Sequence, residues 1–117
     1  MDELGEQLVG WGKVLRLETR GRTTGRPVEV AIGDVEERDG ALLVAAGTPE
    51  TGWARNLETD PACRIAIGGE LRPALADPLI GPDANRAVRE LILKYGTPAE
   101  RLGRGPAFRL RPITIDR

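Results

Sequence analysis

The chain has 117 residues, a formal net charge of −1 and no histidine. This length suits one domain, which we place at residues 1–117, and no apolar run reaches the roughly 20 residues that span a bilayer. The near-neutral charge argues against a nucleic-acid-binding protein, and one cysteine without histidine supports neither an internal disulfide nor a Cys/His metal site. The acidic start is unlike a signal peptide, so we expect a cytoplasmic protein without stable membrane anchoring.

The pattern of apolar and polar residues predicts a mainly β chain. Six segments show either the period-two alternation of half-buried strands or the short apolar run of a covered strand. They span residues 14–19, 28–32, 41–46, 63–67, 70–80 and 108–115. Hairpin turns connect most of them, so we expect an antiparallel sheet. Pro73 and Pro78 lack backbone donors, which places the fifth strand partly at a sheet edge, and the alternation slips at Arg111-Pro112, which predicts a bulge.

The main helix is expected immediately after Pro82. Asp83 is a suitable N-cap, apolar residues recur at helical spacing as far as Tyr95, and Gly96 suits the C-cap. Short flanking helices are expected over residues 1–12, over residues 53–59 and from residue 97 onward. Six strands and one main helix indicate an α+β fold, a small and mostly antiparallel closed barrel with the helix packed across it.

The first candidate site is the basic turn that runs from Arg20 to Arg26. Residues 13–26 hold five basic side chains against one glutamate, so the turn is a local positive feature on a near-neutral chain. Arginine offers forked donors to phosphate or carboxylate oxygens, and glycine lets backbone N–H groups turn toward an anion. The alternative interpretation is an ordinary solvated hairpin loop. The glycine spacing is not that of a P-loop.

The second candidate site is the segment from Ala46 to Leu57. A covered strand leads into a loop of small residues and then into the start of a helix, where anions are favoured. The indole of Trp53 either stacks on a ring or packs in the core against Leu57. Asn56 is too short to cover surface usefully, so we expect it to make a buried hydrogen bond.

Two further side chains have both a structural and a functional interpretation. Cys63 lies on the apolar face of a strand and is expected to be a small core residue. Tyr95 ends the apolar stripe of the main helix and either packs in the core with an exposed hydroxyl or contacts a ligand. No pair of carboxylates in the sequence indicates acid–base catalysis.

The turn region Leu17–Pro27 and the segment Gly52–Pro61 together resemble the deazaflavin-dependent nitroreductase family. The shared pattern is Thr-x-Gly-Arg-x-Thr/Ser-Gly, then Trp-x-x-Asn-Leu-x-x-x-Pro, then a Gly-Gly hairpin. The resemblance extends from about Val14 to Pro112. It implies a split β-barrel, the fold that FMN-binding proteins similar to pyridoxamine-phosphate oxidase also use.

The resemblance implies binding of the 8-hydroxy-5-deazaflavin coenzyme F-420, a hydride carrier with a phosphate and an oligoglutamate tail. The implied activity is hydride transfer to an electron-poor acceptor such as a quinone, an enone or a nitro compound. FMN in the same barrel, and a non-catalytic barrel that binds a small ligand, are the alternatives.

The resemblance also assigns site residues, with no metal and no catalytic side chain among them. The residues implied to hold the anionic tail are Arg20, Arg22, Thr23, Thr24, Gly25 and Arg26. Those implied to line the ring are Gly47, Thr48, Trp53, Asn56 and Leu57. Trp11 and Tyr95 are the candidates for substrate contact. Two copies of the chain are expected to pair as a homodimer and cover the edge formed by the fifth strand.

Overall fold

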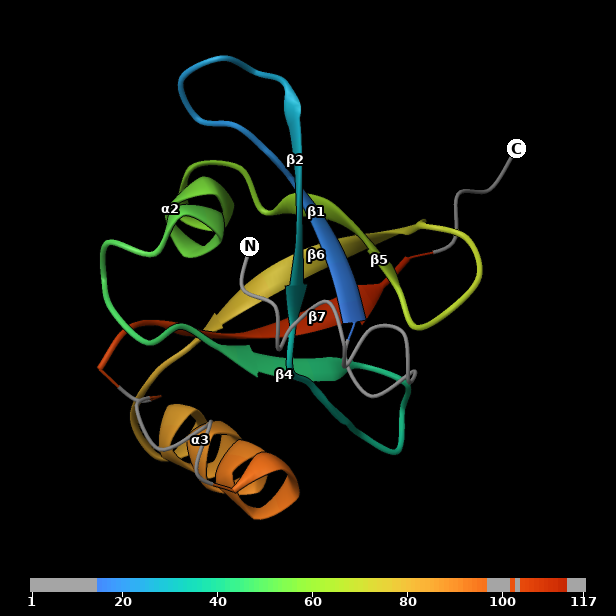
Figure 1. Ribbon diagram of the computed structural model, residues 1–117. Helices are drawn as coiled ribbons and strands as arrows, with labels where there is room; N and C mark the ends of the chain where they lie inside the picture. The colour runs from blue at the N-terminus through green and yellow to red at the C-terminus, as the bar shows by residue number, and fades with distance from the viewer. Residues whose placement is uncertain (1–14, 97–101, 103, 114–117) are drawn as a thin grey trace.

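A curled antiparallel sheet forms the body of the molecule, with one helix beside the β1–β2 turn and another beneath β4 (Figure 1). The computed structural model describes residues 15–96, 102 and 104–113. In chain order the elements are β1 Leu15–Arg20, β2 Pro27–Ile32, β3 Val35–Glu36, β4 Leu42–Ala45, α2 Gly52–Thr59, β5 Ala62–Ala66, β6 Arg72–Leu79, α3 Gly81–Tyr95 and β7 Ala107–Pro112. The strand order is β2-β1-β5-β6-β7-β4-β3, and every neighbouring pair is antiparallel.

The predicted α+β class, the antiparallel pairing and the main helix are confirmed, but the sheet has seven strands rather than six. The added strand, β3, pairs only Val35 and Glu36 with β4, and two residues are too few to show a period in the sequence. Among the described residues the sheet does not close into a ring of hydrogen bonds, because β2 and β3 lie at its two ends. The short helices predicted over residues 1–12 and from residue 97 lie outside the described residues.

The edge position predicted for the fifth strand is wrong, because β6 lies between β5 and β7. Ala76 N donates to Pro61 O, so this side of the β6 backbone faces β5. The backbone of Pro78, two residues further along β6, faces the same way. It lies beyond the first residue of β5, so no residue of that strand stands opposite it. Pro73 faces β7, and its carbonyl accepts from Ile113 N just past the end of that strand. Both prolines therefore stand where a ladder hydrogen bond is not required, and a central strand tolerates them.

The predicted bulge at Arg111-Pro112 is also wrong. The β6–β7 register runs without interruption from Ala74 opposite Pro112 to Leu79 opposite Ala107. The alternation slips because Arg111 and Pro112 are both exposed at the end of β7, so it marks the limit of burial and not an extra residue.

The N-cap predicted for the main helix is wrong by three positions. The helix α3 begins at Gly81, with Ile80 as its N-cap, so Asp83 lies in the first turn. Pro82 does not delay the helix, because the first helical N–H groups have no partner within the helix to lose. The carboxylate of Asp83 still lies near the positive end of the helix dipole. Gly96 is the C-cap as predicted, with φ at 70°.

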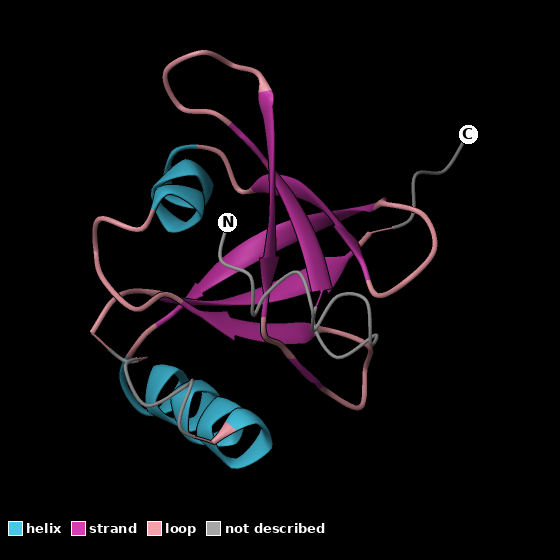
Figure 2. Ribbon diagram, in the orientation of Figure 1, coloured by secondary structure: helices cyan, strands magenta, loops and turns pink. Residues whose placement is uncertain are grey.

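Two clusters of buried side chains lie on opposite faces of the sheet. The inner cluster packs α2, through Trp53 and Leu57, against β1, β5 and β7. The outer cluster packs Leu91 and Ala87 of α3 against β4 and β7. Strand β4 contributes to both clusters, as its continuous apolar run predicted. Figure 2 shows the two helices, in cyan, beside the magenta strands of the sheet. Neither helix in the described ranges is long and apolar enough to cross a membrane.

Gly105→Ala is expected to destabilise the fold. A Cβ atom at Gly105 would stand 2.5 Å from Thr48 O and 3.0 Å from Ala46 O, and backbone atoms cannot turn aside as a side chain can. We expect a loss of about 1–3 kcal/mol in the free energy of unfolding, measured with denaturant. The control is Gly52→Ala, because a Cβ atom there meets nothing within 4 Å. Equal stability of the two variants would show that the Thr48 loop yields at little cost.

Cys63 is expected to react slowly with thiol reagents in the folded protein. Its side chain is buried, and burial, helped by the charge of Asp60, raises the pKa of its thiol to about 12. Only the thiolate reacts, so native-state labelling at pH 8 should be slow and should accelerate as the pH rises toward that value. Urea-unfolded protein is the control, because Cys63 is the only cysteine. Equally fast labelling of folded and unfolded protein would contradict the observed burial.

Candidate functional site

The β1–β2 turn, residues 21–26, is closed by its own backbone. Gly21 N donates to Arg26 O and Gly25 N donates to Gly21 O, both at 2.8 Å. Gly25 has φ at 73°, a conformation that favours glycine. A Cβ atom at Gly21 would stand 2.9 Å from Thr24 Oγ1. Both glycines are thus required for the tight turn that presents Arg22 to α2.

The amide of Asn56, on α2, joins this turn to β1. Asn56 Oδ1 accepts from the backbone N of Arg22 at 3.2 Å and from Arg22 Nη1 at 2.8 Å. Asn56 Nδ2 donates to Thr19 Oγ1 at 3.0 Å. Asn56 and Thr19 are only 3% and 1% exposed. The buried hydrogen bond predicted for Asn56 is therefore confirmed, and it links a strand, a turn and a helix.

A pocket of about 350 Å³, which we call the inner pocket, lies beside this amide. Its lining residues are Gly21, Arg22, Thr23, Thr24, Val28, Val30, Gly52, Trp53 and Asn56. Val28, Val30 and the indole of Trp53 supply apolar surface, whereas Arg22 and the two threonines supply donors. An apolar surface with a few placed polar groups is typical of a small-molecule site.

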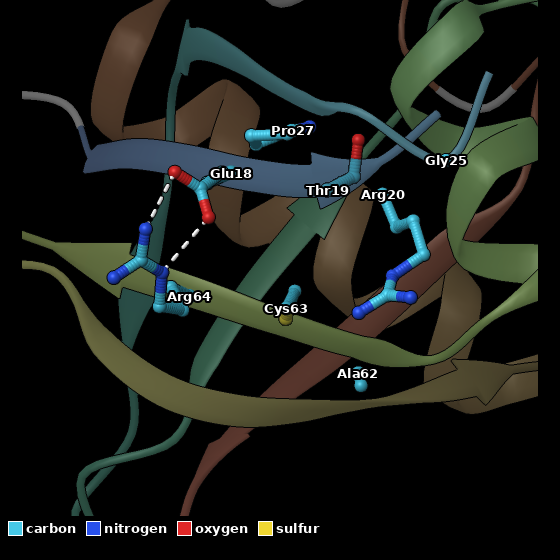
Figure 3. Close-up of a pocket in the computed structure, with 8 residues that line it drawn as sticks. All are labelled: Glu18, Thr19, Arg20, Gly25, Pro27, Ala62, Cys63 and Arg64. Atoms are coloured by element: carbon cyan, nitrogen blue, oxygen red, sulfur yellow. Dashed lines mark hydrogen bonds and ion pairs between the residues drawn. The ribbon is translucent and has the colours of Figure 1, made fainter. Parts of the chain in front are cut away.

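A second hollow, which we call the outer pocket, is lined by residues of β1, β5 and the end of the turn and has a volume of about 330 Å³. Figure 3 shows Glu18 reaching to Arg64 at one end and Arg20 extending over β5 at the other. Glu18 accepts two hydrogen bonds of 2.8 Å from Arg64, and Arg20 Nε lies 3.8 Å from Asp60 Oδ2. Because these charged groups are already paired, the outer pocket has less positive charge available to an anion than the inner pocket has.

The structure separates the residues predicted for the site into three groups. The inner pocket brings together Arg22, Thr23, Thr24, Trp53 and Asn56. The outer pocket contains Arg20 and Gly25. Arg26 is exposed and lines neither pocket.

Three residues predicted to line a ring also lie outside the inner pocket. Gly47 and Thr48 belong to the loop before α2, where Thr48 Oγ1 is 3.2 Å from Thr51 Oγ1. Leu57 is a core residue that is 2% exposed. Trp53 packs in the core, with its ring centroid 6.1 Å from that of Phe108, so the core interpretation is confirmed. It also lines the inner pocket, and stacking on a ligand ring stays a prediction.

Tyr95, predicted as a substrate contact, stabilises the junction between β2 and β3. Its hydroxyl accepts from Asp34 N at 3.0 Å and donates to Asp34 O at 3.1 Å, and Lys94 Nζ donates to the same carbonyl at 2.7 Å. Its ring leaves no room for a Cβ atom at Gly33. Burial raises the pKa of the Asp34 carboxyl, although Lys94 opposes that shift. Trp11, the other substrate candidate, lies outside the described residues.

Sequence reasoning missed the part that β1 and β2 play in the site. Val28, Val30 and Ile32 share one face of β2, and Thr19 shares the buried face of β1 with Leu17. The alternation in the sequence identifies the strands and the shared face of Val28 and Val30. The meeting of that face with Trp53 depends on how α2 packs, which no local pattern contains.

Comparison with known proteins gives a family and a fold. A family model described as F-420H(2)-dependent quinone reductase matches residues 2–104. None of the proteins with curated descriptions matches this chain. A solved structure described as F-420-H2 dependent reductase (FDR-A) is 21% identical, has a TM-score of 0.69, and the match covers 85% of this chain and 94% of that one.

Two other solved structures extend the likeness. One, described as a domain-swapped dimer, has a TM-score of 0.71 and 21% identity over 93% of this chain and 95% of that one. The other, the heme storage protein HutZ from Vibrio cholerae, has a TM-score of 0.66 and 19% identity over 94% and 88%. At these identities the likeness shows the fold alone, which agrees with the expected split barrel. Because the family model covers most of the chain, the protein belongs to the F-420H(2)-dependent quinone reductase family.

Proposed function

We propose that the protein is an oxidoreductase that uses reduced coenzyme F-420 to transfer a hydride to an electron-poor organic acceptor. Membership of a family described as F-420H(2)-dependent, over residues 2–104, is the observation that carries this proposal. The coenzyme supplies the hydride chemistry when it is bound, and the chain has to bind it, orient it and exclude water. A quinone, an enone and a nitro compound are the acceptor classes to be compared.

The inner pocket suits the ring end of such a coenzyme. Its volume of about 350 Å³ lies in the range of small-molecule sites. Val28, Val30 and Trp53 would lie against a flat, largely apolar ring. Arg22 and the neighbouring Thr23 would hold the phosphate or the glutamate carboxylates, because a guanidinium group donates in pairs to such oxygens.

The outer side of the turn is our proposed path for a longer anionic tail. Arg26 is exposed on the turn, forms no ion pair with the described residues, and would make the main contact with the tail. Arg20 and Gly25 line the outer pocket, and Arg20 would have to exchange its 3.8 Å pairing with Asp60 for the tail. The roles predicted for Gly47, Thr48, Leu57, Trp11 and Tyr95 stay predictions.

FMN remains the alternative cofactor to be tested. A similar fold belongs to a chain described as a heme storage protein, so the architecture alone does not select a ligand. Side-by-side titration of the purified protein with F-420 and FMN distinguishes the two. Oxidation of reduced F-420 in the presence of each acceptor then separates an enzyme from a non-catalytic binding protein.

We also propose that two copies associate. Strand β2 lies at one end of the sheet and leaves Val28 41% exposed beside the inner pocket. A chain of similar fold is described as a domain-swapped dimer. The partner surface is therefore expected at β2. It is not expected at β6, because each edge of β6 is already paired with a neighbouring strand.

Trp53→Phe is expected to remove most of the fluorescence change on coenzyme binding. The indole lines the inner pocket, so a bound deazaflavin should quench its emission. Phenylalanine keeps an aromatic ring in the core, and the melting temperature should show that the variant is folded. An unchanged quench in this variant would assign Trp53 to core packing alone.

Arg22→Ala with Arg26→Ala is expected to weaken F-420 binding at least about tenfold, or ~1.4 kcal/mol. The melting temperature of the ligand-free protein should change little, because alanine keeps the backbone N–H that Asn56 Oδ1 accepts from. Wild-type binding should weaken as salt is added, and the double variant should depend on salt less.

The control for the double variant is 8-hydroxy-5-deazariboflavin, the coenzyme fragment without phosphate and glutamates. Wild type and variant should bind this fragment with equal affinity if the two arginines contact only the anionic part. Undiminished binding of intact F-420 by the variant would identify the turn as an ordinary solvated loop.

A further inference from the structure

The neutral amide of Asn56 holds the guanidinium of Arg22 without cancelling its charge. We propose that Asn56 is a positioning residue that orients Arg22 at the inner pocket and leaves its positive charge available to the anionic part of the ligand. This inference rests on the proposed function. It differs from the role that the sequence implied for Asn56, which was contact with the ring.

The hydrogen bonds fix the orientation of this amide. Both groups of Arg22 that reach Asn56 are donors, so only Oδ1 can face them. Nδ2 then faces Thr19 Oγ1, which accepts at 3.0 Å. Rotation of the amide by half a turn would place donors against donors, with Asn56 only 3% exposed. Thr19 on β1 therefore holds the amide, and the amide holds the arginine.

Arg22 is held differently from Arg16 and Arg64. It also differs from Arg26, on the same turn, in having a guanidinium fixed by hydrogen bonds to described residues. Arg16 and Arg64, on the same sheet, each form an ion pair with a glutamate. Among the described residues Arg22 forms no ion pair, and its guanidinium bonds to Asn56 Oδ1 and, at 3.4 Å, to Gly52 O. Both acceptors are neutral. The charge of Arg22 is therefore oriented but not neutralised, which suits it to an anionic ligand.

The guanidinium also keeps donors for a ligand. A guanidinium group has five N–H donors, and the bonds from Arg22 to the described residues use Nη1. Nε and Nη2 are left to meet a pair of oxygens on a phosphate or a carboxylate. Fixing Nη1 reduces the conformational freedom that binding would otherwise have to remove, so the contribution of Asn56 is one of orientation.

The first experiment separates orientation from direct contact. Asn56→Ala, Arg22→Ala and the variant carrying both are titrated with intact F-420 and with 8-hydroxy-5-deazariboflavin. Asn56→Ala should weaken intact F-420 at least fivefold and leave the fragment unchanged. In the Arg22→Ala background it should cost nothing further, because Asn56 acts through Arg22. Additive losses, or an equal loss for the fragment, would overturn the proposal.

The second experiment tests why the residue is an amide. Asn56→Asp has the same shape, keeps an acceptor for Arg22, and lets the Thr19 hydroxyl turn to donate to the other oxygen. It should therefore fold, cancel the charge of Arg22, weaken intact F-420 at least tenfold and flatten the salt dependence. Asn56→Ala keeps that charge, so its salt dependence should match wild type. A merely structural link would be served equally well by the aspartate, so unchanged binding by Asn56→Asp would overturn the proposal.

Asn85→Asp is the matched control. Asn85 is the only other asparagine, and it is exposed on α3, away from both pockets. The Asn85→Asp variant introduces the same change of charge and should leave the affinities for intact F-420 and for 8-hydroxy-5-deazariboflavin unchanged. A wild-type protein that binds neither compound would refute the proposed function and the role of Asn56 with it. A wild type that binds both, with Asn56→Asp showing wild-type affinities, would refute the positioning role alone.

Discussion

The buried amide of Asn56 needs partners on both sides, and this requirement shapes the site. An unpaired buried polar group costs about 1–3 kcal/mol, so Thr19 and Arg22 have to meet it when α2 packs on β1. That condition also sets the rotation of α2 about its axis. Residues three or four positions apart share a helix face, so the rotation that buries Asn56 also directs Trp53 toward the inner cluster. The apolar and polar parts of the inner pocket are thus fixed by one contact.

The inner pocket lies where the β1–β2 hairpin extends beyond the rest of the sheet. β1 pairs with β5 only from Arg16 to Thr19, whereas it pairs with β2 as far as Arg20 opposite Pro27. Near the turn, the face of β2 that carries Val28 and Val30 borders the inner pocket. Helix α2 covers part of that face and leaves Val28 41% exposed. The hollow lies between this part of β2, the turn and the start of α2.

Local sequence patterns predicted most of the helices and strands. The features that they did not predict depend on the register between strands that are distant in the sequence. Period-two alternation identified the long strands, and glycines identified the turn. The positions of Pro73 and Pro78 depend on where β5 begins and β7 ends, which no local window contains. The same limit applies to the site: the partners Arg22 and Asn56 are 34 residues apart, and Asp34 and Tyr95 are 61 apart. Residue types indicated anion binding, but the acceptor that orients Arg22 required the fold.

The choice of ligand has to depend on a few groups, because the architecture is shared by chains with different descriptions. On a chain with net charge −1, long-range attraction of an anion is weak, and a single oriented cation counts for more. Some basic residues on the described surface are engaged in ion pairs, such as Arg64 with Glu18 and Arg111 with Asp77. Arg22 has no such pair among the described residues, and its guanidinium is nevertheless held by hydrogen bonds. A carboxylate at position 56 would hold Arg22 more firmly and would remove that cation. An amide gives a weaker link and keeps the charge, which is the compromise that the proposed anion-binding role of the turn requires.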